Sequence, residues 1–261
     1  MGKLLLRPDE RSGSLDQQQR VWFLDEARGL SVLLMVLHHG AYDAVFLLGW
    51  PLPFLFSGWF GVIRAFFAGV FVLISGCACR LSRNNLRRGA RCLLLAAGLS
   101  LVTALLIPSQ RIRFGVLHLL GCAMLLFACL QPLLDRIPPF FGSVAGFFLF
   151  FFCFHAPDGW LGFGPVRIFL PGLFYQNAFT AALGFPGPGY ASADYFPLVP
   201  WLFLFWAGTC LGVWLRLRQG PAWLYRIHIP FLATVGQKSL WIYLIHQPVL
   251  YLLFLLLRLW F

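Results

Sequence analysis

Long apolar stretches, separated by short polar or basic segments, dominate the sequence from about residue 29 onward. A helix that crosses the hydrocarbon core of a bilayer, about 30 Å thick, needs about 20 predominantly apolar residues. Seven stretches come close to this length. We therefore predict transmembrane helices at about 29–48, 59–78, 92–107, 115–133, 140–155, 199–216 and 238–258.

Residues 156–198 interrupt this pattern, because they are rich in glycine, proline and aromatic residues. The segment is too broken for a clean span and too apolar for a solvated loop. Irregular backbone is tolerated at membrane depth only where protein or a water-filled cavity covers it. We expect the segment to pack over the outer mouth of the bundle, partly as a short re-entrant or interfacial helix.

The predicted fold class is all-α, a polytopic transmembrane helical bundle with about seven spans. A polar N-terminal tail at 1–21 precedes a single transmembrane domain at 22–261. The composition agrees, since 60% of the residues are hydrophobic and only 11% are charged. Such a chain is typical of an integral membrane protein with membrane lipids as its surroundings.

The net charge of +11 changes the picture only slightly. A basic balance can indicate nucleic-acid binding, but most arginines here lie in short loops, as the positive-inside rule describes. The loop at 80–91 carries arginines and no acidic residue, which marks its side as cytoplasmic. We predict a multi-pass protein of the cytoplasmic membrane with its N-terminus inside and no nucleic-acid partner.

His39 and Asp43 form the most informative polar pair, because they lie four residues apart within the first predicted span. This spacing places both side chains on one helix face. Ionisable residues within a membrane are costly and often functional. A carboxylate that fixes the imidazole tautomer would make His39 a general base. The alternative is a structural pair that satisfies its own hydrogen bonds.

Further polar and aromatic residues are candidates for binding a substrate at the predicted outer side. An arginine and a histidine near the start of the fourth span could bind an anionic or carbonyl group, although snorkelling and helix capping are the alternatives. The acidic residue before the sixth span could contact substrate or cap that helix. A histidine in the last span, followed by Gln and Pro, is expected to face the bundle. The candidates are Arg113, His118, Asp194, Tyr195, Trp201 and His246.

Asp25 and Arg28 lie at the inner end of the first span, and Arg87 and Arg88 lie in the basic loop. We interpret these four residues as a candidate contact for an anionic cofactor at the cytoplasmic face. The alternative is local: an acid near a helix N-terminus suits the helix dipole, and an arginine can bind lipid phosphate.

The sequence lacks the motifs that are typical of several enzyme and transporter classes. The sequence contains no GxxxxGK[ST], CxxC, HExxH or GxSxG motif, so ATP-driven transport, metal-dependent hydrolysis and serine hydrolase chemistry are not indicated. The few acidic residues are scattered, and we predict no metal site. The seven cysteines are expected to pack as small apolar residues.

Five ordered blocks resemble a known family: FLDEARGLSVLLMVLHHGAYD, FFAGVFVLISGCACRLSRNNLRRGARCLLLA, IRFGVLHLLGCAMLL, DYFPLVPWLFLFWAG and GQKSLWIYLIHQPVL. They are similar to the bacterial DUF1624 proteins, relatives of heparan-α-glucosaminide N-acetyltransferase. The resemblance implies a membrane acyltransferase that uses acetyl-CoA to modify a sugar, amino sugar or glycan. It also implies that His39 is catalytic with Asp43 as its companion, that His118 and His246 line the cavity, and that the protein dimerises.

Two other functions compete with this interpretation. Intramembrane histidine and aspartate also serve proton relays, so a transporter or flippase of a small anionic or lipid-linked solute is the main alternative, although the two halves show no internal repeat. A non-catalytic scaffold subunit has no need of the ionisable residues at 39, 43, 118 and 246. An alanine at position 39 separates the three: transfer is lost, proton-coupled transport is impaired, or nothing changes.

Overall fold

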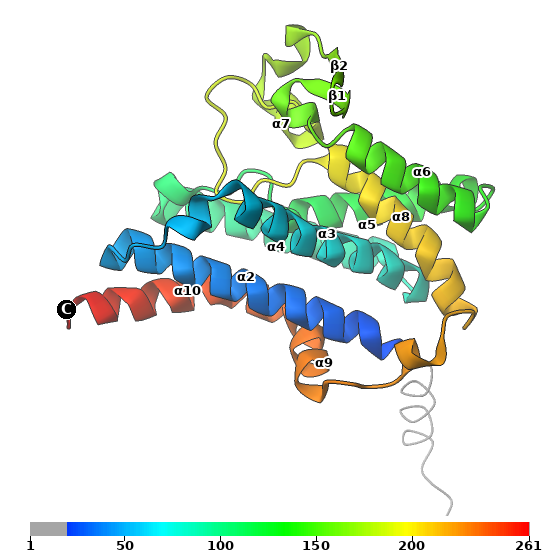
Figure 1. Ribbon diagram of the computed structural model, residues 1–261, viewed down its shortest axis with the longest axis horizontal. Coiled ribbons are helices and arrows are strands. Elements are labelled where there is room, and N and C mark those ends of the chain that lie inside the picture. Colours follow the sequence, from blue (N-terminus) through cyan, green and yellow to red (C-terminus); the bar gives the residue numbers. More distant parts are fainter. Residues whose placement is uncertain (1–19, 261) are drawn as a thin grey trace, which may run out of the picture. The chain divides into compact units, whose positions relative to one another are not determined.

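The computed structural model describes residues 20–260, and most of this part of the chain is helical (Figure 1). The predicted polar tail lies almost wholly outside these residues. Within them, seven helices are long and apolar enough to cross a membrane. They are α2 (Trp22–Leu48), α3 (Gly58–Leu81), α4 (Asn85–Leu106), α5 (Val116–Leu134), α6 (Pro139–Phe152, with its continuation to Asp158), α8 (Leu198–Arg216) and α10 (Ser239–Arg258). The predicted fold class is confirmed.

The helix boundaries differ from the predicted ones where polar residues begin a helix. α2 starts at Trp22 rather than near residue 29, because its acidic first turn is bound by neighbouring groups. α4 starts at Asn85 rather than near residue 92, since the Asn84 side chain accepts a hydrogen bond from Arg87 N at 2.8 Å. This is an ordinary N-cap. An apolar-length criterion misses such polar first turns.

The segment between α6 and α8 contains more regular structure than predicted. Its short helix is α7 (Ala178–Leu183), and it also forms an antiparallel hairpin of β1 (Trp160–Phe163) and β2 (Val166–Phe169). The strands have four residues each and do not alternate between apolar and polar positions. The sequence therefore carries no periodic strand signal. Gly164 turns the hairpin with a φ of 53°.

Contacts divide the chain into two compact units. Within the described residues, the first combines 20–60 with 218–260, and it contains α2, α9 (Pro230–Gln237) and α10. In this unit α2 packs against both α9 and α10. The second unit covers 61–217 and pairs α4 with α5 and α6 with α8. The short helix α9 was not predicted, because eight residues are too few for a span.

Glycines allow α3 and α8 to cross closely within the second unit. A Cβ atom built on Gly76 would lie 2.1 Å from Phe205 O, and one on Gly208 would lie 2.1 Å from Leu73 O. Small residues at such positions let transmembrane helix backbones approach each other. Phe205 and Thr209 are fully buried next to this crossing. The α3–α8 crossing is therefore a closely packed part of the second unit.

In the first unit, Glu26 attaches the start of α9 to α2. Its Oε1 atom accepts hydrogen bonds from His228 N at 2.6 Å and Ile229 N at 2.8 Å, and its Oε2 atom lies 3.3 Å from His228 Nδ1. The Glu26 side chain is 7% exposed. These backbone N–H groups precede the first turn of α9, where helix geometry supplies no acceptor. The Glu26 carboxylate provides the missing acceptor.

Replacing Glu26 with alanine is expected to destabilise the protein by roughly 2 kcal/mol or more, because two N–H groups lose their acceptor at ~1–3 kcal/mol each. Glu26→Gln keeps an oxygen in the same place and should recover most of the loss. Thermal unfolding of the two variants in detergent measures the difference. Equal unfolding temperatures for the alanine variant and the unchanged protein would contradict this role.

Candidate functional site

Four polar residues meet where α2 and α10 pack within the first unit. α2 contributes His39 and Asp43, and α10 contributes His246 and Gln247. The ring centroids of His39 and His246 lie 5.1 Å apart. The Gln247 amide nitrogen donates to both carboxylate oxygens of Asp43, each at 3.2 Å. We call these four residues the α2–α10 polar cluster.

Asp43 is buried, with only 5% of its surface exposed. A buried carboxylate is costly unless other groups hydrogen-bond to it, and the Gln247 amide provides such a bond. The structure thus brings together three residues that the sequence singled out, His39, Asp43 and His246. It adds Gln247, which sequence reasoning missed. The available signal was a polar amide beside His246 inside an otherwise apolar span.

The hydrogen bonds of His246 define its tautomer. Its Nδ1 atom lies 2.7 Å from the carbonyl oxygen of Tyr243. Because a carbonyl can only accept, Nδ1 carries the proton, and Nε2 of the neutral ring keeps its lone pair. Among residues 20–260, neither His246 Nε2 nor Gln247 Oε1 has a hydrogen-bond partner, although both atoms are buried. Two buried acceptors on consecutive residues match a ligand that brings hydroxyl or amine donors.

His118 and Asp194 occupy the N-terminus of α5 in the second unit. His118 Nδ1 accepts a hydrogen bond from Gly115 N at 3.2 Å, and its Nε2 lies 3.4 Å from Ser100 Oγ. Asp194 Oδ2 accepts from Val116 N at 2.9 Å. Both side chains therefore satisfy first-turn N–H groups of α5. Asp194 caps α5, whereas the capping alternative considered from the sequence was the helix that follows it.

The remaining outer candidates also lie within the second unit. The Arg113 guanidinium lies 5.1 Å from the ring centre of Tyr190. The Tyr195 hydroxyl donates to Ala181 O at 2.7 Å, and burial raises the pKa of Tyr195 well above its usual range. Tyr195 therefore stays a neutral donor. Trp201 is buried between aromatic rings, with centroids 5.3 Å from Phe150 and 5.0 Å from Phe196.

Asp194→Ala is expected to lower the free energy of unfolding by about 1 kcal/mol, the usual cost of losing a helix cap. Asp194→Asn keeps an acceptor oxygen and should cost only part of that. Thermal unfolding of both variants in detergent tests the capping role. If Asp194 acted only through substrate, both variants would unfold at the temperature of the unchanged protein.

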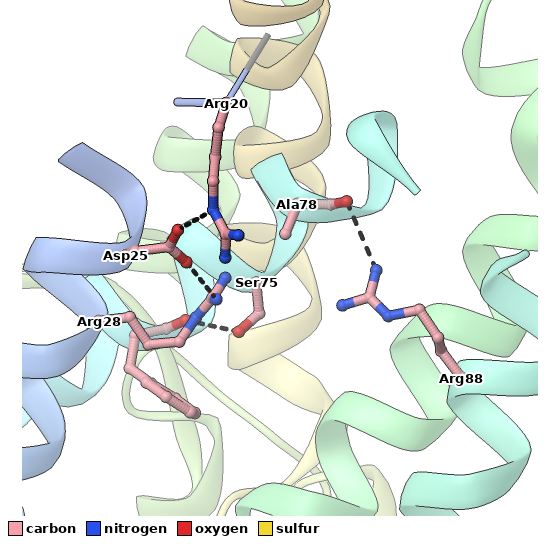
Figure 2. A network of polar contacts seen from close by, with 7 residues as sticks. Arg20, Asp25, Arg28, Ser75, Ala78 and Arg88 are labelled. Atoms are coloured by element: carbon pink, nitrogen blue, oxygen red, sulfur yellow. Dashed lines mark hydrogen bonds and ion pairs between the residues drawn. The ribbon is translucent and has the colours of Figure 1, made fainter. Parts of the chain in front are cut away.

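At the N-terminal end of α2, Asp25 holds two arginines, as Figure 2 shows. Arg20 Nε lies 2.6 Å from Asp25 Oδ2, and Arg28 Nη1 lies 3.4 Å from Asp25 Oδ1. The Asp25 carboxylate is buried and negatively charged. It therefore orients the two guanidinium groups and does not itself contact an anionic cofactor.

The two arginine candidates of the basic loop lie on α4. Arg88 makes a long contact of 3.5 Å with Ala78 O, which Figure 2 also draws. The backbone nitrogen of Arg87 donates to the Asn84 cap, and its side chain is exposed. In the described part of the chain, no group of three or more His, Cys, Asp or Glu side chains is arranged to hold a metal ion.

The sequence was also compared with known proteins. Residues 20–248 match the family described as heparan-alpha-glucosaminide N-acetyltransferase, catalytic. No curated protein and no solved structure gives a significant match. The family match covers α2 to α9 and ends within α10, at a residue just beyond the α2–α10 polar cluster.

Proposed function

Because the chain belongs to the heparan-alpha-glucosaminide N-acetyltransferase catalytic family, we propose that it transfers an acetyl or other acyl group from acyl-CoA to a sugar, amino sugar or glycan. The observation that carries this proposal is the α2–α10 polar cluster. It combines two histidines, a buried carboxylate and two buried acceptor atoms that lack partners among residues 20–260. A sugar hydroxyl or amine supplies the donors that these atoms need.

In the proposed reaction, an imidazole of the cluster removes the proton from the acceptor hydroxyl or amine. The acceptor oxygen or nitrogen then forms a bond to the thioester carbonyl carbon, the carbon–sulfur bond breaks, and the imidazolium returns its proton to the thiolate. His39 is the proposed base. Asp43 is its proposed companion, held in place by the Gln247 amide. The orphaned Nε2 of His246 would accept a hydrogen bond from the same substrate.

The arginines at the N-terminal end of α2 support a phosphate-bearing donor. Asp25 fixes the guanidinium groups of Arg20 and Arg28, and fixed guanidinium groups bind phosphate well. Arg87 and Arg88 on α4 stay proposed cofactor contacts on the basis of the sequence alone. We place this end of α2 at the cytoplasmic face of a bacterial inner membrane, where acyl-CoA is made. A homodimer remains part of the proposal through the family resemblance alone.

Transport of an anionic or lipid-linked solute is the alternative, because buried histidine and aspartate also relay protons. The test uses the purified full-length chain in lipid nanodiscs with acetyl-CoA labelled in the acetyl group. Amino sugars and glycans serve as acceptors, and an unrelated polytopic protein serves as the control. Label on an acceptor, with stoichiometric release of CoA, would support acyl transfer. No labelled acceptor together with no binding of acyl-CoA would reject it.

A further inference from the structure

A cavity of about 360 Å³ opens at one end of the second unit, where α3, α5 and α8 end and α6 begins. Its charged lining consists of Arg80, Asp135 and Arg216, and its apolar lining includes Ile137, Val213 and Cys210. Cys210 is buried, whereas Asp135 and Arg216 are exposed. The cavity therefore has a polar, accessible part and an apolar part.

Arg80 is the unusual residue of this cavity, because its side chain is only 7% exposed. Its Nε donates to Thr209 O at 3.0 Å, its Nη1 lies 2.5 Å from Asp135 Oδ1, and its guanidinium lies 4.9 Å from the ring centre of Phe127. A guanidinium has five N–H donors, so these contacts leave it further capacity for hydrogen bonds. The backbone and ring contacts hold the guanidinium in one place, and Asp135 is its charged partner.

The charge balance of the lining favours an anion. Asp135 is the single acid among the lining residues and can neutralise only one of the two arginines. Arg216 lies in the last turn of α8, and it lines the same cavity as Arg80. Two guanidinium groups, one rigid and one exposed, suit the tetrahedral oxygens of a phosphate group.

We propose that this cavity binds a phosphate group, with Arg80 and Arg216 as its ligands and with the adjoining apolar lining in contact with the rest of the molecule. Phosphate of this kind has two sources, the headgroup of an anionic phospholipid and the phosphates of coenzyme A. The apolar lining accepts the glycerol and first acyl carbons of a lipid. Asp135 competes with the phosphate for Arg80, so it limits the affinity of the site.

Native mass spectrometry of the full-length chain tests the proposal with dioctanoyl phosphatidylglycerol, dioctanoyl phosphatidylcholine and coenzyme A as separate probes. Arg216→Gln is expected to weaken binding roughly five- to tenfold, the loss of one charge-assisted contact. Arg83→Gln, which removes an exposed arginine from the adjacent basic loop, is the matched control and should change binding less than twofold. Asp135→Asn should strengthen binding, because it releases Arg80. All three changes lie at exposed positions and should leave the fold intact.

The phosphatidylglycerol and coenzyme A probes distinguish the two sources of phosphate, and phosphatidylcholine is the lipid without net charge. A selective loss of phosphatidylglycerol by Arg216→Gln identifies a lipid site, and a selective loss of coenzyme A identifies a donor-phosphate site. Only the coenzyme A result rests on the proposed acyl transfer, so a protein without transferase activity can still satisfy the lipid result. Equal losses from Arg216→Gln and Arg83→Gln would show diffuse attraction by surface charge and would overturn the proposal. Unchanged binding in Arg216→Gln would also overturn it.

Discussion

Replacing His39 with alanine is expected to lower the rate of acyl transfer by about 10²–10⁴-fold, the usual contribution of a positioned general base. The imidazole lies beside His246 and on the α2 face that carries Asp43, inside a unit whose other span residues are mostly apolar. Neither the bilayer nor these apolar residues can take its place as a base. The loss should appear in kcat, because the proposed role belongs to the proton transfer and not to donor binding.

Leu37→Ala is the matched control for His39→Ala. Leu37 lies on the same helix, and its side chain is 67% exposed. Leu37→Ala removes slightly more side-chain volume than His39→Ala does, but it leaves the four residues of the α2–α10 polar cluster in place. Its turnover should stay within twofold of the unchanged protein. Turnover is measured with labelled acetyl-CoA. A His39→Ala variant that keeps full turnover would exclude His39 as the base. A parallel fall in turnover and thermal stability would instead indicate a structural pair.

The spans were predictable because a bilayer imposes one requirement, about 20 apolar residues in a row. Seven such stretches could be read directly, and the described residues contain seven helices long and apolar enough to cross a membrane. The boundaries at Trp22 and Asn85 were not predictable from hydropathy, because capping and ion pairs extend those helices into polar sequence. The β1–β2 hairpin was missed for a related reason: glycine geometry forms its turn, and its strands are too short to show a period.

The candidate site was only partly predictable. His39 and Asp43 share a face by helical spacing alone, so their proximity follows from local sequence. Gln247 contacts Asp43 across 204 positions of sequence, and only the packing of α2 on α10 reveals that contact. His118 and Asp194 show the opposite case, since residue type suggested chemistry and the structure assigns them to the N-terminus of α5. Polar residues near helix ends are ambiguous until their partners are known.

The second large effect is expected on the stability of the protein, from substitutions at the α3–α8 crossing. Gly76→Ala or Gly208→Ala places a methyl group 2.1 Å from a carbonyl oxygen of the opposite helix, Phe205 O or Leu73 O. Because the obstacle is backbone and not a flexible side chain, the helices must separate. Overpacking of this kind costs about 1–3 kcal/mol and occasionally more. We expect the larger figure here, since the neighbouring Phe205 is fully buried and cannot move aside.

Gly98→Ala on α4 is the control for both substitutions, because no atom beyond its chain neighbours and its own helix backbone lies within 4 Å of the Cβ position there. That variant should unfold at the same temperature or slightly higher, since alanine favours a helix over glycine by about 1 kcal/mol. Thermal unfolding in detergent measures all three. The crossing also carries the hydrogen bond from Arg80 to Thr209 O, so the glycine variants should weaken phosphate binding at the Arg80 cavity as well. Variants at Gly76 and Gly208 as stable as Gly98→Ala would show that α3 and α8 do not cross at these glycines.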